Sequence, residues 1–424
     1  MRFFHLSDLH IGRTLHGYSL KEDQEHILGE VVEYAKKLRP DAIVIAGDIY
    51  DRPAPSAEAV TIFDGFLTAL AKITPAIPVL MIAGNHDSAG RLDYARRILE
   101  NQNIYIAGKV PSREDPETCG HIRKVTLGDA FGEVDFYLLP FLKPGYVRGL
   151  FTDSQEIKSE EVPQLEGANE AARTDSRTDA LLLGGKTEQM AADKDAPRTY
   201  SEAVARMIER EHIDWTRRNV LVSHQFYTGA GQEMMTCDSE IFSVGGIDNV
   251  DIRGIQNFDY AALGHLHGAQ SAGLEYIRYC GTLLKYSVSE AKQEKSLHMV
   301  ELTEKGGAVK IEKLPLHPLR DVQVLRGTLE DILQSAVSDD YVSITLTDDT
   351  EHYRPKEQLE RRFSHILEIR VDNERTRRRL HWEEEEEPAG TPLSVFSEFF
   401  EEMQGRAMSE EEETMMEHVM DTLL

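Results

Sequence analysis

The sequence predicts an α/β fold, and two observations support this prediction. Over residues 1–110, short apolar runs alternate with longer stretches whose apolar residues recur at helical spacing. The apolar runs are rich in β-branched residues and are bounded by glycine or proline, as in DAIVIA at 41–46. This alternation favours a largely buried sheet whose strands are connected by helices.

The individual elements follow from the same two patterns. Apolar runs predict strands at 2–6, 41–46, 79–83 and 104–107, and apolar residues at helical spacing predict helices at 20–38, 56–73 and 93–101. Pro40 and Pro75 close the first two helices. Further strands are expected at 134–140, 219–223, 260–263 and 276–280, and a further helix at 200–211.

Length and composition place the chain among globular proteins of two or three domains. Of its 424 residues, 41% are hydrophobic and 29% are charged, which provides a sizeable core and excludes wholesale disorder. No apolar run approaches about 18 residues, so no membrane span is expected. Asp8 and His10 stand where a signal peptide would still be apolar, so a cytoplasmic protein is expected. Three scattered cysteines form neither a disulfide framework nor a CxxC zinc site.

Composition also divides the chain into successive parts. Residues 1–316 are expected to form the main domain, with a polar and exposed insertion at 153–197. Residues 317–382 are expected to form a small α+β domain, followed by an acidic linker at 383–391. The elements expected in the small domain are strands at 321–325, 341–346 and 365–371 and helices at 328–337 and 355–363.

The C-terminal part, 392–424, is expected to form a pair of amphipathic helices. The helices are expected at 393–403 and 409–423. Ser409 and Glu412 have the spacing of a capping box, in which each residue bonds to the backbone of the other. A pair of helices so rich in Phe and Met either folds back onto the main domain or lies on a partner helix.

The chain is strongly acidic, with 74 Asp and Glu against 47 Lys and Arg and a net charge of −27. This charge repels a polyanion at long range, which argues against a DNA-binding protein that works alone. Residues 383–424 hold 14 acidic residues and a single Arg406, so nearly half of the excess lies in the last tenth of the chain. An enzyme that carries metal ions, or that works with a basic partner, remains compatible with this distribution.

Five short polar segments carry the residues suited to chemistry, and most of them directly follow an expected strand. They are Asp8-Leu9-His10, Gly47-Asp48-Ile49-Tyr50-Asp51, Gly84-Asn85-His86-Asp87, Ser223-His224 and Gly264-His265-Leu266-His267. Loops at the carboxyl ends of strands in an α/β sheet converge on one crevice. We therefore expect the five segments to meet.

Oxygen and nitrogen ligands in one crevice favour a divalent metal site. Asp, Asn and His suit Mn²⁺ or Fe²⁺, with Zn²⁺ as a third choice, and the set lacks the thiolates of structural zinc sites. The seven candidate ligands are Asp8, His10, Asp48, Asn85, His224, His265 and His267. One ion takes at most about six ligands, whereas two ions that share a carboxylate use all seven. A two-metal centre stabilises phosphoryl transfer, so these residues predict hydrolysis of a phosphate ester by an activated water.

Each segment alone also has a purely structural interpretation. Asp-x-His is common, Gly-Asp after a strand is often only a turn, and a single histidine such as His224 is more often a satisfied core residue. Gly-His-Leu-His can place two imidazoles on one face of a strand for packing. The joint occurrence of all five segments in this order makes coincidence a poor explanation.

The chain resembles the calcineurin-like dimetal phosphoesterase family in the order of these segments, which reads D-x-H, G-D-x-x-D, G-N-H-D, a single His and G-H-x-H. The resemblance covers about 1–150 and 200–290, and it implies an α/β sandwich of two sheets flanked by helices. A branch of the family that contains DNA nuclease subunits is similar in two runs, FFHLSDLHIGRTLHGYSLKEDQ at 3–24 and YCGTLLKYSVSE at 279–290. The insertion at 153–197 is longer and more polar than this branch leads us to expect.

The resemblance implies a role for each candidate residue. The bridge between the ions would be Asp48, one ion would take Asp8, His10 and His267, and the other would take Asn85, His224 and His265. His86 would contact the scissile phosphate as a general acid or charge stabiliser, and Asp87 would orient His86 or tune its charge. Asp51 either orients a ligand or caps the following helix. Arg13 and His16 are candidate DNA contacts, although such loop residues are usually only exposed.

The same resemblance implies a DNA nuclease with two Mn²⁺ ions, for which Mg²⁺, Fe²⁺ or Zn²⁺ are possible substitutes. It implies double-strand 3′→5′ exonuclease activity and endonuclease activity on single strands and hairpins, in DNA repair and recombination. Members of this branch form a nuclease dimer with two ABC-type ATPase subunits, bound through C-terminal helices that are 392–424 here. Residues 317–382 would cap the site and position DNA. The chain itself has no Walker A pattern for ATP.

Two other functions fit parts of the sequence. The same ligands would serve a phosphoesterase that acts on nucleotides or other small phosphodiesters, but such an enzyme needs neither 317–382 nor the apolar tail. A non-catalytic scaffold for the ATPase would predict an eroded site. All seven ligand positions and His86 are chemically competent in this chain, which disfavours the scaffold.

Overall fold

The computed structural model describes residues 1–151 and 196–373, with gaps at 117, 230, 232–233, 241–247 and 350–353. Beyond 373 it describes residues 376, 393, 396–397, 400–401, 404, 406–409 and 412–416. Most of the expected insertion at 153–197, the expected linker at 383–391 and most of the expected tail helices therefore lie outside the described residues.

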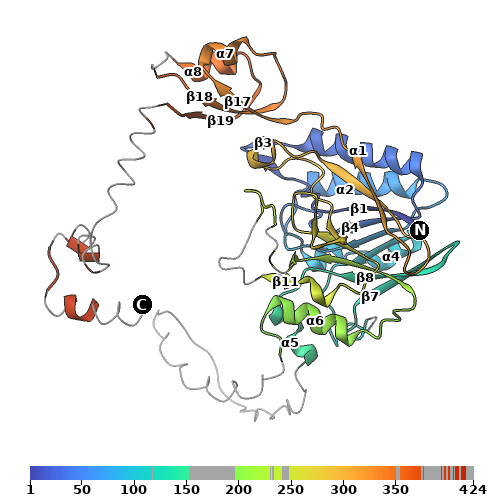
Figure 1. Ribbon diagram of the computed structural model, residues 1–424. Helices are drawn as coiled ribbons and strands as arrows, with labels where there is room; N and C mark the ends of the chain where they lie inside the picture. The colour runs from blue at the N-terminus through green and yellow to red at the C-terminus, as the bar shows by residue number, and fades with distance from the viewer. Residues whose placement is uncertain are drawn as a thin grey trace, which may run out of the picture. The chain divides into compact units, whose positions relative to one another are not determined.

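The first compact unit, Met1–Gln323, contains two six-stranded sheets (Figure 1). The first sheet has the order β16 (Lys310–Pro315), β15 (Ser296–Glu301), β1 (Arg2–Leu6), β4 (Ala42–Ala46), β5 (Val79–Ile82) and β6 (Ile104–Ala107). Strands β1, β4, β5 and β6 run parallel, and β15 pairs with β1 in the antiparallel direction. The four parallel strands are the four that the apolar runs of the first 110 residues predicted.

The second sheet has a parallel centre with antiparallel edges. Its order is β13 (Gln270–Ala272), β14 (Leu274–Tyr279), β12 (Tyr260–Gly264), β9 (Arg218–His224), β8 (Gly132–Leu139) and β7 (Arg123–Asp129). Strands β14, β12, β9 and β8 are parallel, whereas β13 and β7 pair with their neighbours in the antiparallel direction. All four central strands were predicted, and both edge strands were missed.

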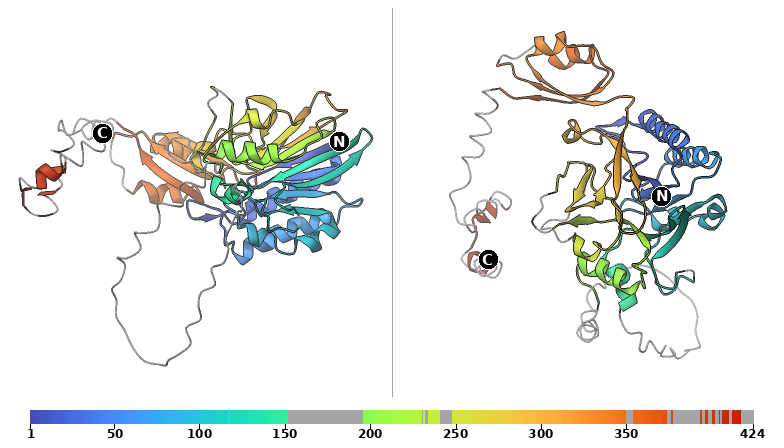
Figure 2. Two further views of the ribbon diagram at one scale, coloured as in Figure 1. Left: turned by 90° about the horizontal axis from the view of Figure 1, so that it is seen from below. Right: turned by 45° about the vertical axis from the view of Figure 1, so that its right-hand side comes forward.

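The two sheets pack face to face, as Figure 2 shows from two further sides. Phe3 of β1 meets Phe136 of β8 and Tyr260 of β12 with edge-on rings, whose centroids are 5.5 and 5.7 Å away. Val44 of β4 and Leu80 of β5 join the same buried layer. This arrangement confirms the predicted α/β sandwich of two sheets.

Helices cover the outer faces of the sandwich. Helices α1 (Lys21–Leu38) and α2 (Ala57–Ala71) lie together on the first sheet, and α5 (Pro144–Phe151) and α6 (Tyr200–Arg210) lie on the second (Figure 1). Both faces of each central strand are therefore covered, which explains why these strands are continuous apolar runs.

Three features of this unit differ from the predictions. The helix expected at 93–101 is instead α3 (Ala89–Leu92) and α4 (Arg96–Leu99), because Ala95 has a left-handed backbone with φ of 59° and interrupts the helix. Strands β7, β15 and β16 were not predicted; exposed polar residues alternate along β7 and β16, whereas β15 is almost entirely buried. Two small sheets were also missed: β2 (Thr14–Leu15) with β3 (Tyr18–Ser19), and β10 (Phe226–Thr228) with β11 (Asn249–Asp251).

The second unit begins at Val324 and contains a three-stranded sheet with two helices. Its elements are β17 (Val322–Gly327), α7 (Leu329–Gln334), β18 (Tyr341–Leu346), α8 (Pro355–Glu360) and β19 (His365–Val371). Leu329 and Leu359 of the helices pack with Val342 and Ile344 of the central strand. All five elements were predicted within three residues at each end.

The capping box expected in the tail is present. The backbone N–H of Ser409 donates to the Glu412 carboxylate at 2.9 Å, and the backbone N–H of Glu412 donates to Oγ of Ser409 at 3.4 Å. A helical stretch follows at 412–416. Among the residues that the structure describes, no helix combines the length and the apolar character needed to cross a membrane.

Candidate metal centre

The ends of five strands bring the polar segments together at one edge of the sandwich. In the first sheet, Asp8 follows β1, Asp48 follows β4 and Asn85 follows β5, and these three strands are parallel neighbours. In the second sheet, His224 ends β9, while His265 and His267 follow β12. All seven candidate ligands therefore lie at the carboxyl ends of parallel strands, where the sequence predicted a common crevice.

Glycines in these segments allow neighbouring loops of one sheet, and the two sheets themselves, to approach each other closely. A Cβ on Gly84 would overlap the Asp48 carboxylate, and a Cβ on Gly264 would overlap the carbonyl oxygen of Ala46. A Cβ on Gly47, whose φ is +90°, would overlap the ring of His224. The glycine of each Gly-containing segment is thus required by close approach, and not only by the need for a turn.

Four candidate ligands have a left-handed backbone. The φ angles are 53° at Asp8, 42° at His10, 51° at Asp48 and 107° at His265. Non-glycine residues rarely adopt this conformation, and it persists only where surrounding contacts hold it. Here the N–H of His10 donates to the carbonyl of Asp48 at 3.0 Å, and the N–H of His265 donates to the Asp8 carboxylate at 3.0 Å. The loops that present the ligands are therefore fixed by one another.

The first ligand group consists of Asp8, His10 and His267. Candidate ligand atoms of these three residues all lie within 4.8 Å of one another. The Nε2 atoms of His10 and His267 are 3.1 Å apart, and Nε2 of His10 lies 3.7 Å from Oδ2 of Asp48. The side chains are almost fully buried, so these nitrogen and oxygen atoms converge on a space shielded from solvent.

The second group consists of Asn85, His224 and His265. Oδ1 of Asn85 lies 2.9 Å from Nε2 of His224 and 3.1 Å from Nδ1 of His265. Nε2 of His224 also lies 3.4 Å from Oδ2 of Asp48. The same Asp48 oxygen thus faces both groups, which is the position that a bridging carboxylate would take.

Hydrogen bonds outside each group fix the orientation of two imidazoles. Nδ1 of His224 donates to the carbonyl of Ala46 at 2.8 Å, which leaves its Nε2 directed at Asn85 and Asp48. Nδ1 of His267 lies 2.6 Å from Oγ of Ser239, which leaves its Nε2 directed at His10. Histidine ligands of metals are commonly held in this way through their second nitrogen.

The titratable groups of the cluster do not respond alike. Burial alone would lower the pKa of His224, but Asp48 and Asp8 raise it to about 9, and burial raises the pKa of Asp8. Burial alone would raise the pKa of Asp48, but its histidine neighbours, His224 foremost, hold it well below its ordinary range. Burial lowers the pKa of His10 and of His265, the latter to about 3. These two rings are therefore neutral and the Asp48 carboxylate is charged, which is the protonation state that metal ligands require.

The chemistry of this donor set fits two divalent ions. Asp, Asn and His supply hard-to-borderline donors around one shared carboxylate, and the cluster contains no thiolate. A separate group of Cys237, Glu240 and His267 also lies within 4.8 Å, but burial raises the pKa of the Cys237 thiol to well above its ordinary value. That thiol is therefore protonated and is a poor ligand.

His86 and Asp87 differ in their surroundings. Nδ1 of His86 donates to the carbonyl of Asp51 at 2.9 Å, and the ring packs edge-on against His10 at 4.8 Å between centroids. The Asp87 carboxylate accepts the backbone N–H groups of Ile49, Tyr50 and Gly84 at 2.9–3.1 Å. Asp87 therefore ties two ligand loops together, and its role toward His86 stays a prediction of the resemblance.

The structure also places the three remaining candidate residues, Asp51, Arg13 and His16. The Asp51 carboxylate accepts a hydrogen bond from Arg13 at 3.3 Å and lies 4.0 Å from Nδ1 of His10. The helix that follows is capped by Ser56 and not by Asp51. Arg13 also donates to the carbonyl of Ser239 and lies over the ring of Tyr286. His16 is exposed in the turn between β2 and β3, with φ of 49°. Arg13 is thus held by protein contacts, whereas His16 faces solvent.

A buried chain of polar residues behind His267 was missed in the sequence. Oγ of Ser239 donates to the Glu290 carboxylate at 2.6 Å, and Nζ of Lys295 donates to the same carboxylate at 2.6 Å. Burial alone would raise the pKa of Glu290, but Lys295 holds it below its ordinary range. Glu290 ends the run at 279–290 that marked the resemblance, but nothing in the sequence around Ser239 or Lys295 indicated this contact.

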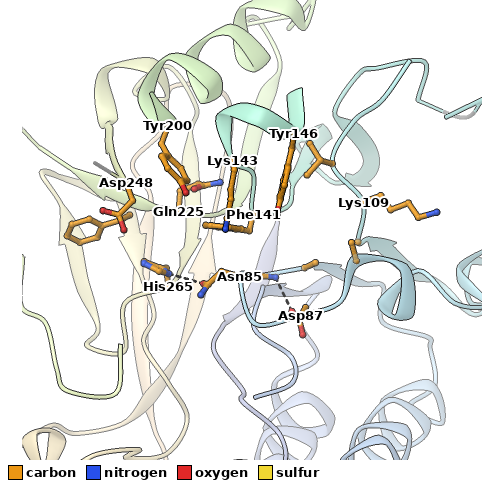
Figure 3. A pocket seen from close by; sticks show the side chains of 16 residues that line it. Asn85, Asp87, Lys109, Phe141, Lys143, Tyr146, Tyr200, Gln225, Asp248 and His265 are labelled. Carbon is orange, nitrogen blue, oxygen red and sulfur yellow. Dashed lines mark hydrogen bonds between the residues drawn. The ribbon is translucent and has the colours of Figure 1, made fainter. Parts of the chain in front are cut away.

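A cavity of about 620 Å³ opens beside Asn85 and His265 (Figure 3). Its wall includes Phe141 and Lys143 from the segment after β8, and Tyr146 and Tyr200 from α5 and α6. No sequence pattern indicated this cavity, because its wall joins elements that are distant along the chain.

Comparisons with known proteins agree with this geometry. Residues 1–164 match the calcineurin-like phosphoesterase family, and residues 318–404 match the type 5 capsule protein repressor C-terminal domain. Two relatives named as the SbcD component of the nuclease SbcCD, from Staphylococcus epidermidis and Staphylococcus saprophyticus, are each 28% identical to this chain. Both alignments cover all of this chain and 99% of the relative.

The two-sheet sandwich, the buried Asp, Asn and His cluster and the full-length similarity lead to the same assignment. The chain contains a calcineurin-like phosphoesterase domain, is similar over its full length to SbcD nuclease subunits, and is a metal-dependent phosphoesterase.

Proposed function

We propose that the chain is the Mn²⁺-dependent nuclease subunit of an SbcCD-type complex. The proposed activities are double-strand 3′→5′ exonuclease and endonuclease on single strands and hairpins, in DNA repair and recombination. The observation that carries the proposal is the pair of ligand groups that share Asp48, whose Oδ2 lies 3.7 Å from His10 and 3.4 Å from His224. Two metal ions so placed would activate water and neutralise the charge that develops in phosphodiester hydrolysis.

In this proposal Asp48 and the two ligand groups would hold the ions, with Asp48 shared between the groups, and the ions would supply an activated water and positive charge. His86 contacts the phosphate that is cut. Because the carbonyl of Asp51 can only accept a hydrogen bond, Nδ1 of His86 carries a proton and Nε2 is free to exchange one with the substrate. A ring held in this way is suited to donate to a phosphate oxygen or to the leaving oxygen. Asp87 acts indirectly, by holding the loops of Asp48 and Asn85 in place.

The remainder of the chain is proposed to bind DNA and a partner protein. We infer that 317–382 caps the centre and positions DNA, and that 392–424, beyond the linker at 383–391, binds an SbcC-type ABC ATPase. The support is the domain match at 318–404 and the complex named in the two relatives. The proposed assembly contains a dimer of this chain, and the proposed compartment is the cytoplasm.

The nuclease assay that tests this proposal uses end-labelled hairpin and linear duplex DNA with purified protein and Mn²⁺. We expect cleavage that requires Mn²⁺ and that falls by about 10²–10⁴-fold in His86→Gln, because the variant loses proton transfer. Mn²⁺ binding, measured by calorimetry, should remain close to wild type. His212→Gln, at an exposed histidine outside the ligand cluster, is the matched control. Wild-type cleavage by His86→Gln would refute the assigned role.

A second assay separates nuclease from small-substrate phosphoesterase activity. Turnover of a generic phosphodiester without any DNA cleavage would refute the nuclease proposal but would still agree with the proposed metal centre. Deletion of 392–424 should abolish binding of the ATPase in a pull-down while Mn²⁺ binding persists. Undiminished affinity for the ATPase after the deletion would contradict the assignment of the tail.

A further inference from the structure

We propose that Arg13 is a positioning residue of the metal centre and not a contact for DNA. Its side chain holds His10, His86 and His267 in place through the three groups that it touches. The inference rests on the proposed function, because it takes two of these histidines as metal ligands and His86 as the residue that contacts the phosphate. It concerns a residue for which the sequence suggested a DNA contact.

The guanidinium of Arg13 has protein contacts on three sides. Nη1 donates to Oδ1 of Asp51 at 3.3 Å, and Nη2 donates to the carbonyl of Ser239 at 3.2 Å. Its central carbon lies 5.3 Å from the ring centroid of Tyr286, within the range of a cation–π contact. Only 17% of the side chain is exposed. Little of this guanidinium is left to meet a phosphate, whereas its planar fork joins three segments that are distant along the chain.

The contact with Ser239 leads to the candidate ligand His267. Arg13 fixes the backbone of Ser239, and Oγ of the same residue lies 2.6 Å from Nδ1 of His267. The backbone N–H of His267 donates to the Glu240 carboxylate at 2.6 Å, so the segment that carries Ser239 is bound to the ligand at two points. A shift of this segment would therefore turn the imidazole away from the orientation that a metal ion needs.

The contact with Tyr286 reaches two candidate ligands at once. The Tyr286 ring packs edge-on against the rings of His10 and His267, with centroids 5.6 and 6.2 Å away. Its hydroxyl donates to the carbonyl of Leu9, which directly precedes His10. Because Arg13 covers the same ring, it limits the movement of a side chain that supports both histidines.

The contact with Asp51 orients His86 and compensates charge. The carbonyl of Asp51 accepts a hydrogen bond from Nδ1 of His86 at 2.9 Å, and its Oδ1 lies 4.0 Å from Nδ1 of His10. By binding this carboxylate, Arg13 holds the residue that orients His86. The ion pair also compensates the charge of the guanidinium, which would otherwise repel a divalent cation nearby.

The test compares full-length Arg13→Ala and Arg13→Lys with wild type in Mn²⁺ calorimetry and in turnover of bis(p-nitrophenyl) phosphate. This small diester has no strand that could reach a DNA contact. Both variants should bind Mn²⁺ about 10-fold more weakly. At saturating Mn²⁺, kcat on the diester should fall by about 10- to 100-fold while KM changes by less than about threefold. Arg13→Lys should not restore either property, because an ammonium is a point charge and cannot bridge the three groups.

Two further variants control for the loss of an arginine and for the route through Ser239. Arg253→Ala removes an exposed arginine that pairs with Asp251, and it should change neither measurement. Ser239→Ala removes the hydroxyl next to His267. Arg13→Ala should cost at least about threefold less Mn²⁺ affinity in that background than in wild type, because the two residues act on the same ligand. Melting temperatures above the assay temperature would verify that the variants are folded.

The outcomes distinguish this inference from the proposed function. Wild-type kcat of Arg13→Lys on the diester, with a loss only on DNA, would make Arg13 a DNA contact and overturn the inference. Additive losses of Mn²⁺ affinity in the Arg13 and Ser239 variants would also overturn it, since the two residues would then act independently. A wild-type protein that hydrolyses the diester but not DNA would refute the nuclease proposal alone. A wild-type protein that does not bind Mn²⁺ would refute the proposed metal centre, and the role of Arg13 with it.

Discussion

Replacement of Glu290 by Ala should destabilise the protein and loosen the metal centre together. Glu290 is fully buried and accepts from Nζ of Lys295, which is itself only 8% exposed. Removing one partner of a buried ion pair typically costs about 3–5 kcal/mol, because the other charge is left without its counterion. Lys295 keeps acceptors in the carbonyl of His267 and Oγ1 of Thr282, which places the expected loss near the lower end of this range.

The same substitution acts on a metal ligand through Ser239. Oγ of Ser239 lies between Nδ1 of His267 and the Glu290 carboxylate, at 2.6 Å from each. Without the carboxylate, Ser239 loses the acceptor that fixes its hydroxyl, and the His267 ring loses its orientation. Partners that orient a ligand in this way typically contribute about 10- to 100-fold in metal affinity.

Urea unfolding and Mn²⁺ calorimetry on Glu290→Ala and Glu290→Gln measure both effects. The amide still accepts a hydrogen bond, so Glu290→Gln should lose only about 1–3 kcal/mol of unfolding free energy. Its loss of Mn²⁺ affinity should also be smaller than that of Glu290→Ala. Glu58→Ala is the matched control, because Glu58 forms an exposed ion pair with Lys21, and solvent screens such pairs so that they contribute little to stability. This reasoning would be refuted if the free energy of unfolding of Glu290→Ala lay within about 1 kcal/mol of wild type and its Mn²⁺ affinity were unchanged.

Two further predictions concern a buried histidine and a motif glycine. Neither ring nitrogen of His298 has a hydrogen-bond partner among the described residues, and burial lowers the pKa of His298 to about 2. The unfolded chain therefore binds more protons than the folded chain below about pH 6.5, and His298 should cost about 2 kcal/mol of stability between pH 7 and pH 5. Urea unfolding at the two pH values should show a loss in wild type that exceeds the loss in His298→Leu by about this amount, because other buried histidines such as His5 and His265 also have lowered pKa values and contribute in both proteins, and equal losses in both would contradict it. Gly84→Ala should displace Asp48 and weaken Mn²⁺ binding in calorimetry by at least about tenfold. Gly29→Ala is the control, because Gly29 is exposed in α1 with open space around it, and this variant should bind Mn²⁺ as wild type does. Wild-type affinity of Gly84→Ala would show that the loop absorbs the added methyl group.

Much of the fold and the identity of the candidate ligands could be predicted because both depend on short stretches of sequence. Strands β1, β4 and β5 are almost entirely buried, and a glycine or an acid follows closely after each of them and marks its carboxyl end. Edge strands such as β7 and β16 lack this signal, since one side of each faces solvent. The left-handed backbone at Asp8 and Asp48 also has no sequence signal, because neither residue is glycine.

Contacts between side chains that are distant in the sequence could not be predicted in the same way. Ser239 reaches His267 across 28 residues and Glu290 across 51. No sequence pattern indicated that the Asp87 carboxylate accepts hydrogen bonds from three backbone N–H groups. The wall of the cavity joins Lys109 to Tyr200 and Asp248 in the same manner.

Strand formation and ligand chemistry are local properties, so the order of residues along the chain is enough to predict which of them end the strands and can bind metal. Tertiary packing is needed to place Asp48 opposite both His10 and His224, at 3.7 and 3.4 Å, and to bring a buried Glu290 behind His267. The contact between Asp48 and His224 depends on how the two sheets register against each other, because Asp48 follows β4 of the first sheet and His224 ends β9 of the second. That register is set by burial of the apolar layer around Phe3, Phe136 and Tyr260, a property of surfaces that come together only on folding.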